Sequence, residues 1–103
     1  MTNVFSKVAN GVLYISMSGE LDESASVSVR TELDTVINRS NFDKVVIDLS
    51  KLVFMDSTGI GVLIGRYKKL RAVGALVFLA NPTAAVDKIL RLSGIYDIMP
   101  KVG

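Results

Sequence analysis

Three consecutive polar residues, Asp56, Ser57 and Thr58, are the part of this sequence best suited to chemistry. The apolar run at residues 45–49 predicts a buried strand, and apolar residues between 60 and 70 recur with helical spacing. Ser57 is therefore predicted to lie at the N-terminus of a helix. Free backbone N–H groups and the positive end of the helix dipole attract anions there. A serine at such a position can either cap the helix or carry a phosphate group.

The sequence contains no cysteine and no histidine. This excludes disulfides, thiolate metal sites and cysteine nucleophiles, as well as Ser-His catalysis and the commonest zinc sites. Ser-Lys chemistry stays open, with Lys51, Lys68 and Lys69 the lysines nearest to Ser57 in sequence. The last two lie about three helical turns away, roughly 15 Å at the helical rise. We therefore expect a protein that is not an enzyme and that needs no cofactor or metal.

The composition is that of one domain spanning residues 1–103, with 50% hydrophobic residues for a core. The net charge is only +2, and no basic stripe with interleaved aromatics predicts nucleic-acid binding. No apolar run approaches the ~18 residues that would span a bilayer. Residues 1–7 lack the form of a signal peptide. We expect a cytoplasmic protein that binds neither nucleic acid nor membrane.

Turn signals and hydrophobic periodicity predict alternating strands and helices. The strands are expected at residues 4–8, 12–18, 44–50, 75–80 and 95–99, and the helices from Ser24 to Arg39, from Ser57 to just before Gly74, and from Asn81-Pro82 to Gly94. Asn10-Gly11 is a strong two-residue hairpin signal. The unbroken apolar run at 75–80 is typical of a central strand buried on both faces.

This order predicts an α/β fold: a mixed, mostly parallel sheet of four to five strands, with an N-terminal antiparallel strand and three or more helices. Loops at the carboxyl ends of parallel strands gather at one edge of the sheet. The loops at residues 19–23, 51–56 and 81–82 all follow strands, so we expect them to lie together.

Three segments carry a resemblance to a known family. Residues 19–22 (GELD), 54–68 (FMDSTGIGVLIGRYK) and 92–95 (LSGI) are similar to those of bacterial anti-sigma factor antagonists, the stand-alone form of the STAS domain. The run Gly65-Arg66-Tyr67-Lys68 most resembles the stage II sporulation protein AA branch. The Asp-Ser-Thr triplet also occurs in general-stress antagonists, so it does not separate sporulation from stress control. The resemblance covers essentially the whole chain.

The resemblance implies a partner-switching protein. Such antagonists bind an anti-sigma factor that is also an ATP-dependent serine protein kinase, and thereby release the sigma factor to activate transcription. The kinase phosphorylates the serine that follows the motif aspartate, which maps to Ser57. Phosphorylation inactivates the antagonist, and a PP2C-type serine phosphatase restores it.

The resemblance also implies a partner-binding site made of Asp22, Ser24, Asp56, Ser57, Thr58, Gly59, Ile60 and Gly61. Asp22 could equally be a helix N-cap. Each glycine lowers helix stability by up to ~1 kcal/mol, so glycines inside a predicted helix indicate a requirement other than helix stability. We interpret Gly59 and Gly61 as a bare surface for a partner, and Gly65 as helix–sheet packing.

The basic residues Arg66, Lys68, Lys69 and Arg71 occupy the later part of the helix predicted after Ser57. They are interpreted as a solvated face that complements the negative helix end, and a basic docking surface is the alternative.

Other function classes stay open. The helix N-terminus could serve a nucleotide- or anion-binding module, although no glycine-rich phosphate loop supports it. Asp48 on a predicted strand suggests a phospho-aspartate receiver, but residues 9–11 offer no acidic cluster for Mg²⁺. A role within a larger stress-signalling scaffold would leave the same sequence pattern.

Overall fold

The N-terminal hairpin forms where Asn10-Gly11 predicts it. In the computed structural model, which describes residues 2–102, both turn residues have positive φ angles of 53° and 78°. This geometry matches the right-handed twist of the flanking strands. The turn joins β1 (Asn3–Ala9) to β2 (Val12–Leu21), and the two strands pair antiparallel from Asn3↔Ser18 to Ala9↔Val12.

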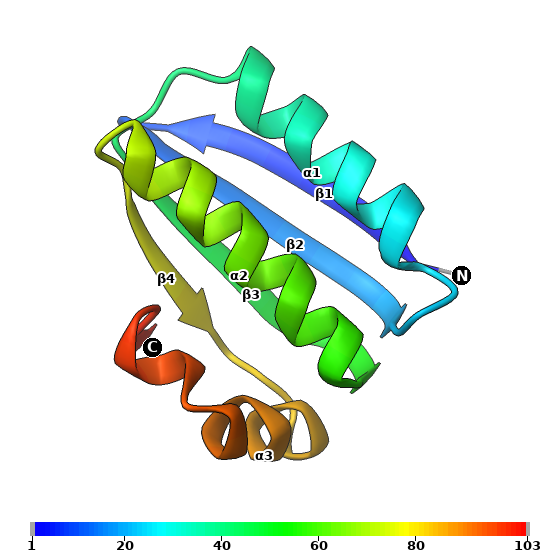
Figure 1. Cartoon of the computed structure of the whole chain (residues 1–103). Helices are drawn as coiled ribbons and strands as arrows, with labels where there is room; N and C mark the ends of the chain where they lie inside the picture. The colour runs from blue at the N-terminus through cyan, green and yellow to red at the C-terminus, as the bar shows by residue number, and fades with distance from the viewer. Residues whose placement is uncertain (1, 103) are drawn as a thin grey trace.

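The sheet has the order β1-β2-β3-β4-β5, and every pair after the hairpin is parallel. Its other strands are β3 (Lys44–Met55), β4 (Leu76–Ala80) and β5 (Lys101–Val102). The connections run through α1 (Ser26–Arg39), α2 (Ser57–Ala72) and α3 (Ala84–Ser93), followed by the short 3₁₀ helix η1 (Ile95–Asp97). The predicted α/β class, the antiparallel N-terminal strand and the three helices are confirmed (Figure 1).

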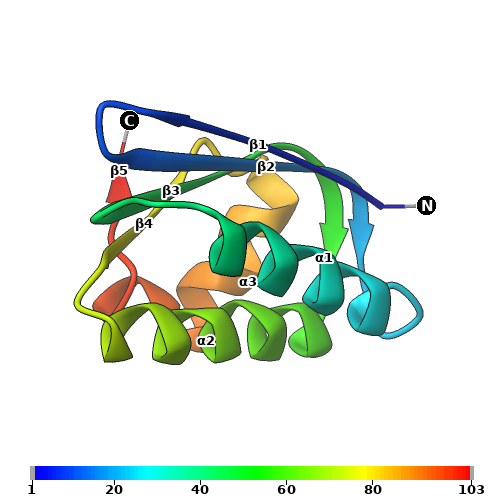
Figure 2. The same cartoon turned by 90° about the horizontal axis from the view of Figure 1, so that it is seen from above.

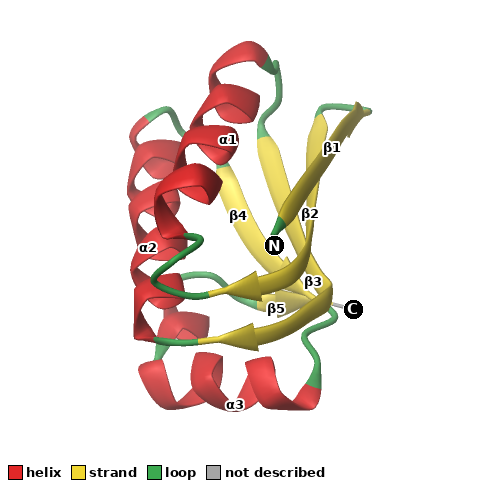
Figure 3. Cartoon of the chain, turned by 90° about the vertical axis from the view of Figure 1, so that its right-hand side faces the viewer, coloured by secondary structure: helices red, strands yellow, loops and turns green. Residues whose placement is uncertain are grey.

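Helices α1 and α2 lie side by side on one face of the sheet, as Figures 2 and 3 show from two directions. The other face carries no helix within residues 2–102. The prediction that residues 75–80 are buried on both faces is therefore wrong. Val77 and Leu79 point to the helices and are buried, whereas Leu76 is 51% exposed.

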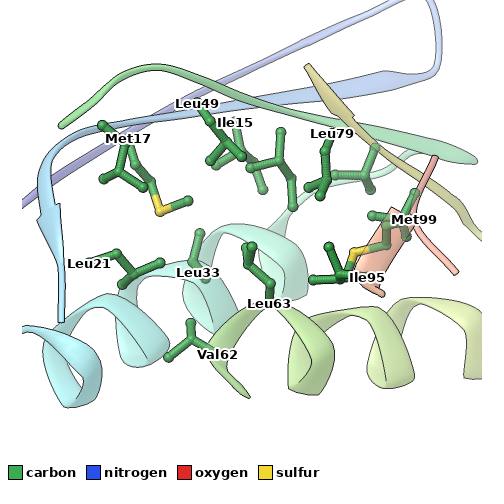
Figure 4. Close-up of a cluster of buried hydrophobic side chains, with 14 of the residues drawn as sticks. Ile15, Met17, Leu21, Leu33, Leu49, Val62, Leu63, Leu79, Ile95 and Met99 are labelled. Carbon is green, nitrogen blue, oxygen red and sulfur yellow. The ribbon is translucent and has the colours of Figure 1, made fainter. Parts of the chain in front are cut away.

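The core fills the space between the sheet and the helices. Alternate residues of β2, namely Leu13, Ile15 and Met17, are almost fully buried, because strand side chains point to opposite faces in turn. Leu33 of α1 and Leu63 of α2 reach toward them (Figure 4). One side of β2 therefore forms part of the core.

Two strands extend further than predicted. β2 continues to Leu21 and β3 to Met55, so residues 19–21 and 51–55 are paired strand rather than loop. The register of the β2–β3 ladder shifts between Ser16 and Ser18 and again between Gly19 and Glu20, which breaks the alternation of buried and exposed residues.

Two other boundaries also differ. The first long helix begins at Ser26 rather than Ser24, because residues 22–25 form a turn closed by side-chain bonds. The predicted strand at 95–99 is instead the turn of η1, with Met99 N–H donating to the Ile95 carbonyl at 2.8 Å. Ile95 and Met99 are both buried in the core, so their apolar character reflects packing rather than a strand.

None of the helices within residues 2–102 has the length and apolar character needed to cross a bilayer.

Candidate functional site

The carboxyl ends of β2 and β3 meet at one edge of the sheet. Leu21 pairs with Met55, and the Asp56 N–H donates to the Leu21 carbonyl at 3.4 Å. Asp22 and Asp56 follow directly after the paired residues. The structure thus brings together the first two of the three strand-end segments that the sequence predicts to meet.

The third segment lies elsewhere. The side-chain amide of Asn81 donates to Asp48 Oδ2 at 3.2 Å, and the Thr83 hydroxyl donates to the Leu52 carbonyl at 3.2 Å. Because β4 stops at Ala80, opposite Asp48, the strands β2 and β3 continue well past its end. The prediction that residues 81–82 join the site near Asp56 is wrong for this reason.

Asp56 is the cap of α2. It has extended backbone angles, and its Oδ1 accepts hydrogen bonds from the N–H groups of Thr58 at 2.9 Å and Gly59 at 3.2 Å. Such a cap stabilises a helix by typically about 1 kcal/mol. Ser57 is accordingly the first residue inside the helix, and the alternative in which Ser57 itself is the cap is wrong.

Ser57 is exposed, and its hydroxyl takes no part in the cap. It lies in the first turn of α2, where the helix dipole favours a negative group. Thr58 beside it is half-buried. The arrangement presents the Ser57 hydroxyl to the solvent at a helix end whose dipole favours a negative group.

Asp22 closes the turn before α1. Its carboxylate accepts a hydrogen bond from the Ser24 hydroxyl at 2.8 Å and another from the Ala25 N–H at 3.0 Å. These bonds, that of Ser24 foremost, hold the pKa of Asp22 below its usual value. Ser24 is exposed and Asp22 half-buried, so this turn is a charged and accessible neighbour of the α2 N-terminus.

The glycines of α2 differ in their surroundings. Gly59 is buried, and a Cβ atom there would lie 2.7 Å from the Leu21 carbonyl oxygen. Ile60 is also buried, at 8% exposure. Gly61 is exposed, and a Cβ there would meet nothing within 4 Å, as also at Gly65. Packing therefore explains Gly59, and its interpretation as a bare surface is wrong. Gly61 fits the predicted bare surface. The packing interpretation of Gly65 is wrong.

Two exposed apolar side chains stand beside the predicted residues. Val53 is 65% exposed and Phe54 is 47% exposed, and both precede Asp56 in β3. The predicted partner-binding residues omit them. Phe54 is part of the motif that carries the family resemblance. Membership in this motif is the one sequence signal that points to Phe54 as a site residue. Only the structure shows that the two side chains point away from the core.

One of the four basic residues of α2, Arg66, departs from the predicted solvated face. Arg66 is only 5% exposed, and its Nε lies 2.9 Å from Asp34 Oδ1 of α1. Lys69 binds the other carboxylate oxygen of Asp34 at 2.9 Å. The Arg71 guanidinium donates to the Ala75 carbonyl at 3.2 Å. Arg66 and Lys69 thus pair with α1, whereas Arg71 bonds a carbonyl just beyond the end of its own helix. Lys68, Lys69 and Arg71 are all exposed.

Asp48 lies in the middle of β3. Burial alone would raise its pKa, but hydrogen bonds from Ser50 and Asn81 and the charge of Lys51 hold the pKa below its usual value. The described part of the chain, residues 2–102, contains no cluster of three or more acidic side chains that could hold a metal ion. The site of interest is therefore the edge that carries Ser57.

Comparisons with known proteins agree with this architecture. A family model described as the STAS domain matches residues 4–102. The anti-sigma F factor antagonist of Paenibacillus polymyxa is 40% identical over 90 residues, which cover 87% of this chain and 77% of that protein.

Two solved structures of SpoIIAA, an anti-sigma factor antagonist, are also similar. The unphosphorylated form aligns with a TM-score of 0.80 at 28% identity, covering 98% of this chain and 89% of that one. The phosphorylated form, from Bacillus, aligns with a TM-score of 0.71 at 28% identity, covering 100% and 92%. These relatives are regulatory proteins by name. The chain belongs to the STAS-domain family.

Proposed function

We propose that this chain is an anti-sigma factor antagonist whose activity is switched by phosphorylation of Ser57. The observation that carries the proposal is the position of Ser57, exposed on the first turn of α2 while Asp56 supplies the cap. The names of the relatives support the same role.

In this proposal the unphosphorylated chain binds an anti-sigma factor that is also an ATP-dependent serine protein kinase. Binding releases the sigma factor, which then activates transcription. The contact surface comprises the exposed end of α2 around Ser57 and Gly61, the turn at Asp22, and the exposed side chains of Val53 and Phe54. Exposed apolar side chains favour contact with a partner, and a bare glycine lets a partner approach the helix backbone closely.

Phosphorylation acts through charge at this surface. A phosphoserine carries about −1.5 to −2 charges at pH 7. The helix dipole offsets it by roughly 0.3–2 kcal/mol, so the fold tolerates the group. Burying the same charge against a partner beside Asp56 and Asp22 costs several kcal/mol. About 4 kcal/mol is already close to a thousandfold in affinity, which suffices for a switch.

Removal and addition of the phosphate both require that Ser57 is accessible at the helix end. A PP2C-type serine phosphatase removes the phosphate from the exposed helix end and restores binding. Because Asp56 is held by its two capping bonds, it fixes the start of the helix and thereby the direction in which Ser57 is presented. The kinase supplies the catalytic groups for the transfer.

Phosphosite mapping tests the proposal. The protein is incubated with ATP in lysate of its source organism, and the modified residue is identified by mass spectrometry. We expect one phosphate, on Ser57, that is absent from Ser57→Ala and retained in Ser28→Ala, a matched change at an exposed serine of α1 outside the proposed contact surface. A phosphate elsewhere, or none despite confirmed kinase activity, would overturn the proposal.

A further inference from the structure

The seam between the helices α1 and α2 carries an excess of positive charge. Asp34 of α1 uses both carboxylate oxygens there, one for Arg66 at 2.9 Å and the other for Lys69 at 2.9 Å. Arg30 lies one helical turn before Asp34, is exposed, and forms no ion pair within residues 2–102. One carboxylate therefore serves a seam that holds three cations.

The two arginines of the seam repel each other. Burial lowers the pKa of Arg66, the charge of Asp34 opposes this shift, and the charge of Arg30 adds to it. The Arg66 side chain is only 6% exposed, and its Nη1 has no hydrogen-bond partner within residues 2–102. Buried donors are normally paired, so this guanidinium is incompletely satisfied. A second carboxylate at the seam would offset the repulsion and supply the missing counter-charge.

The outer side of α2 next to this seam is bare. Gly61 and Gly65 lie one turn apart, and a Cβ atom at either position would meet nothing within 4 Å. Residues four apart share one face of a helix, so Ser57, Gly61 and Gly65 form a continuous strip of small residues, which we call the bare strip. A partner can approach the backbone of α2 along it.

The bare strip and Arg30 lie next to each other. The helices α1 and α2 run side by side in the same direction (Figure 2), and the pair of Asp34 with Arg66 sets their relative position. One turn earlier on each helix, Arg30 is level with Val62, the neighbour of Gly61. The long side chain of Arg30 therefore stands beside an open stretch of α2.

We propose that Arg30 and the bare strip form a second part of the partner-binding surface, which receives an acidic side chain of the kinase partner. This inference rests on the proposed function. A carboxylate that lies over Gly61 can pair with the free guanidinium of Arg30 and brings the negative charge that the seam lacks. The surface is continuous with Ser57, which lies one turn before Gly61, about 6 Å along the helix axis.

This position links the acidic side chain of the partner to the switch. The unmodified chain offers a positive seam beside an uncharged Ser57, so a carboxylate is attracted. A phosphate on Ser57 adds about −1.5 to −2 charges one turn away and repels the same carboxylate. The affinity for the partner is therefore highest in the unphosphorylated state.

Phosphorylation kinetics test this surface. The rate at which the kinase in the lysate modifies Ser57 is measured by mass spectrometry over a range of protein concentrations. We expect Arg30→Glu to raise the concentration that gives half the maximal rate by about tenfold, with the maximal rate retained. Arg30→Lys keeps the charge and should stay close to the wild type. Arg39→Glu, the same charge change on an exposed residue of α1 beside β1, is the control and should have little effect.

A steric variant tests the bare strip independently. Gly65→Gln places a side chain over the strip and should raise the same concentration by about tenfold. Because the position has open space, the variant should keep the circular dichroism spectrum of the wild type. Thr35→Gln, which adds a similar side chain to the exposed side of α1 beside β1, should leave the kinetics unchanged.

The outcomes separate this inference from the proposed function. Wild-type kinetics in both Arg30→Glu and Gly65→Gln would overturn the acidic-partner surface while Ser57 remains the switch. An equal effect of Arg30→Glu and Arg39→Glu would also overturn it, because overall charge rather than a local contact would then control the rate. A wild type that acquires no phosphate on Ser57 would overturn the proposed function and this inference with it.

Discussion

Gly59 of α2 lies so close to Leu21 of β2 that a Cβ atom at Gly59 would be 2.7 Å from the Leu21 carbonyl oxygen. The same Cβ would lie 2.7 Å from Cγ of Met55. Leu21 and Met55 are the paired last residues of their strands. The missing side chain therefore lets α2 begin directly against both strand ends, and this contact holds Ser57 at the edge of the sheet.

Gly59 and Gly61 should respond oppositely to alanine. Gly59→Ala forces a backbone or side-chain shift, so we expect a loss of about 1–3 kcal/mol in the free energy of unfolding. Gly61→Ala has open space around it and should gain up to about 1 kcal/mol from helix propensity. Urea unfolding of the two variants measures both. Equal free energies of unfolding for the two variants would show that the close approach at Gly59 does not affect stability.

Local signals in the sequence predict much of this edge. Asn10-Gly11 specifies the hairpin because its positive φ angles need those residue types. The strand before Asp56 and the helical spacing after it correctly place Ser57 at a helix start. Such features depend on a few adjacent residues, which is why a single sequence suffices for them.

Tertiary contacts account for what the sequence does not show. Gly59 and Gly61 look alike in sequence, but one faces the strand ends and the other faces the solvent. Arg66 looks like one more surface cation, yet Asp34 of another helix draws it into the α1–α2 interface. The free face of the sheet leaves Leu76 exposed although the strand reads as fully apolar. Each outcome depends on residues distant in sequence.

The Arg66–Asp34 pair yields a stability prediction. Burial lowers the pKa of Arg66 while the charge of Asp34 opposes this shift, and Nη1 of Arg66 has no hydrogen-bond partner within residues 2–102. Asp34→Asn leaves the buried cation without its counter-charge and should cost about 1–3 kcal/mol. Arg66→Met, which replaces the charge with an apolar chain, should cost less. Urea unfolding ranks the two variants, and the reverse order would contradict this account.

Asp87 of α3 ties the C-terminal segment to the fold and makes stability pH-dependent. It accepts hydrogen bonds from the Tyr96 hydroxyl at 2.6 Å and from Lys101 at 3.2 Å. The Tyr96 bond first, then the Lys101 bond, hold the pKa of Asp87 below its usual 3.8. The unfolded chain therefore takes up a proton at higher pH than the folded chain, so acidification below about pH 4 lowers the free energy of unfolding.

Asp87→Asn tests this linkage. The variant should be less stable than the wild type at neutral pH, and the difference should shrink as the pH falls below the usual carboxylate range. Urea midpoints measured across a pH series give the comparison. Tyr96→Phe, which removes the main donor, should reduce the same difference. A gap between wild type and Asp87→Asn that stays constant with pH would exclude this role for Asp87.

Ser57→Asp should separate stability from binding. An aspartate in the first turn of α2 interacts favourably with the helix dipole, so the free energy of unfolding should stay unchanged or rise by up to about 1 kcal/mol. Binding to the proposed anti-sigma factor should weaken by about tenfold, or about 1.4 kcal/mol, because the variant supplies one charge where a phosphate supplies nearly two. Calorimetric titration and thermal unfolding of the same sample measure the two quantities.

Ser57→Asn is the matched control, since it has the shape of aspartate without the charge. It should bind the partner nearly as well as the wild type. If Ser57→Asn weakens binding as much as Ser57→Asp, side-chain size rather than charge controls the interface. If Ser57→Asp instead unfolds the start of α2, the phosphate would act through the fold, because the helix end would then fail to tolerate even one added charge next to Asp56.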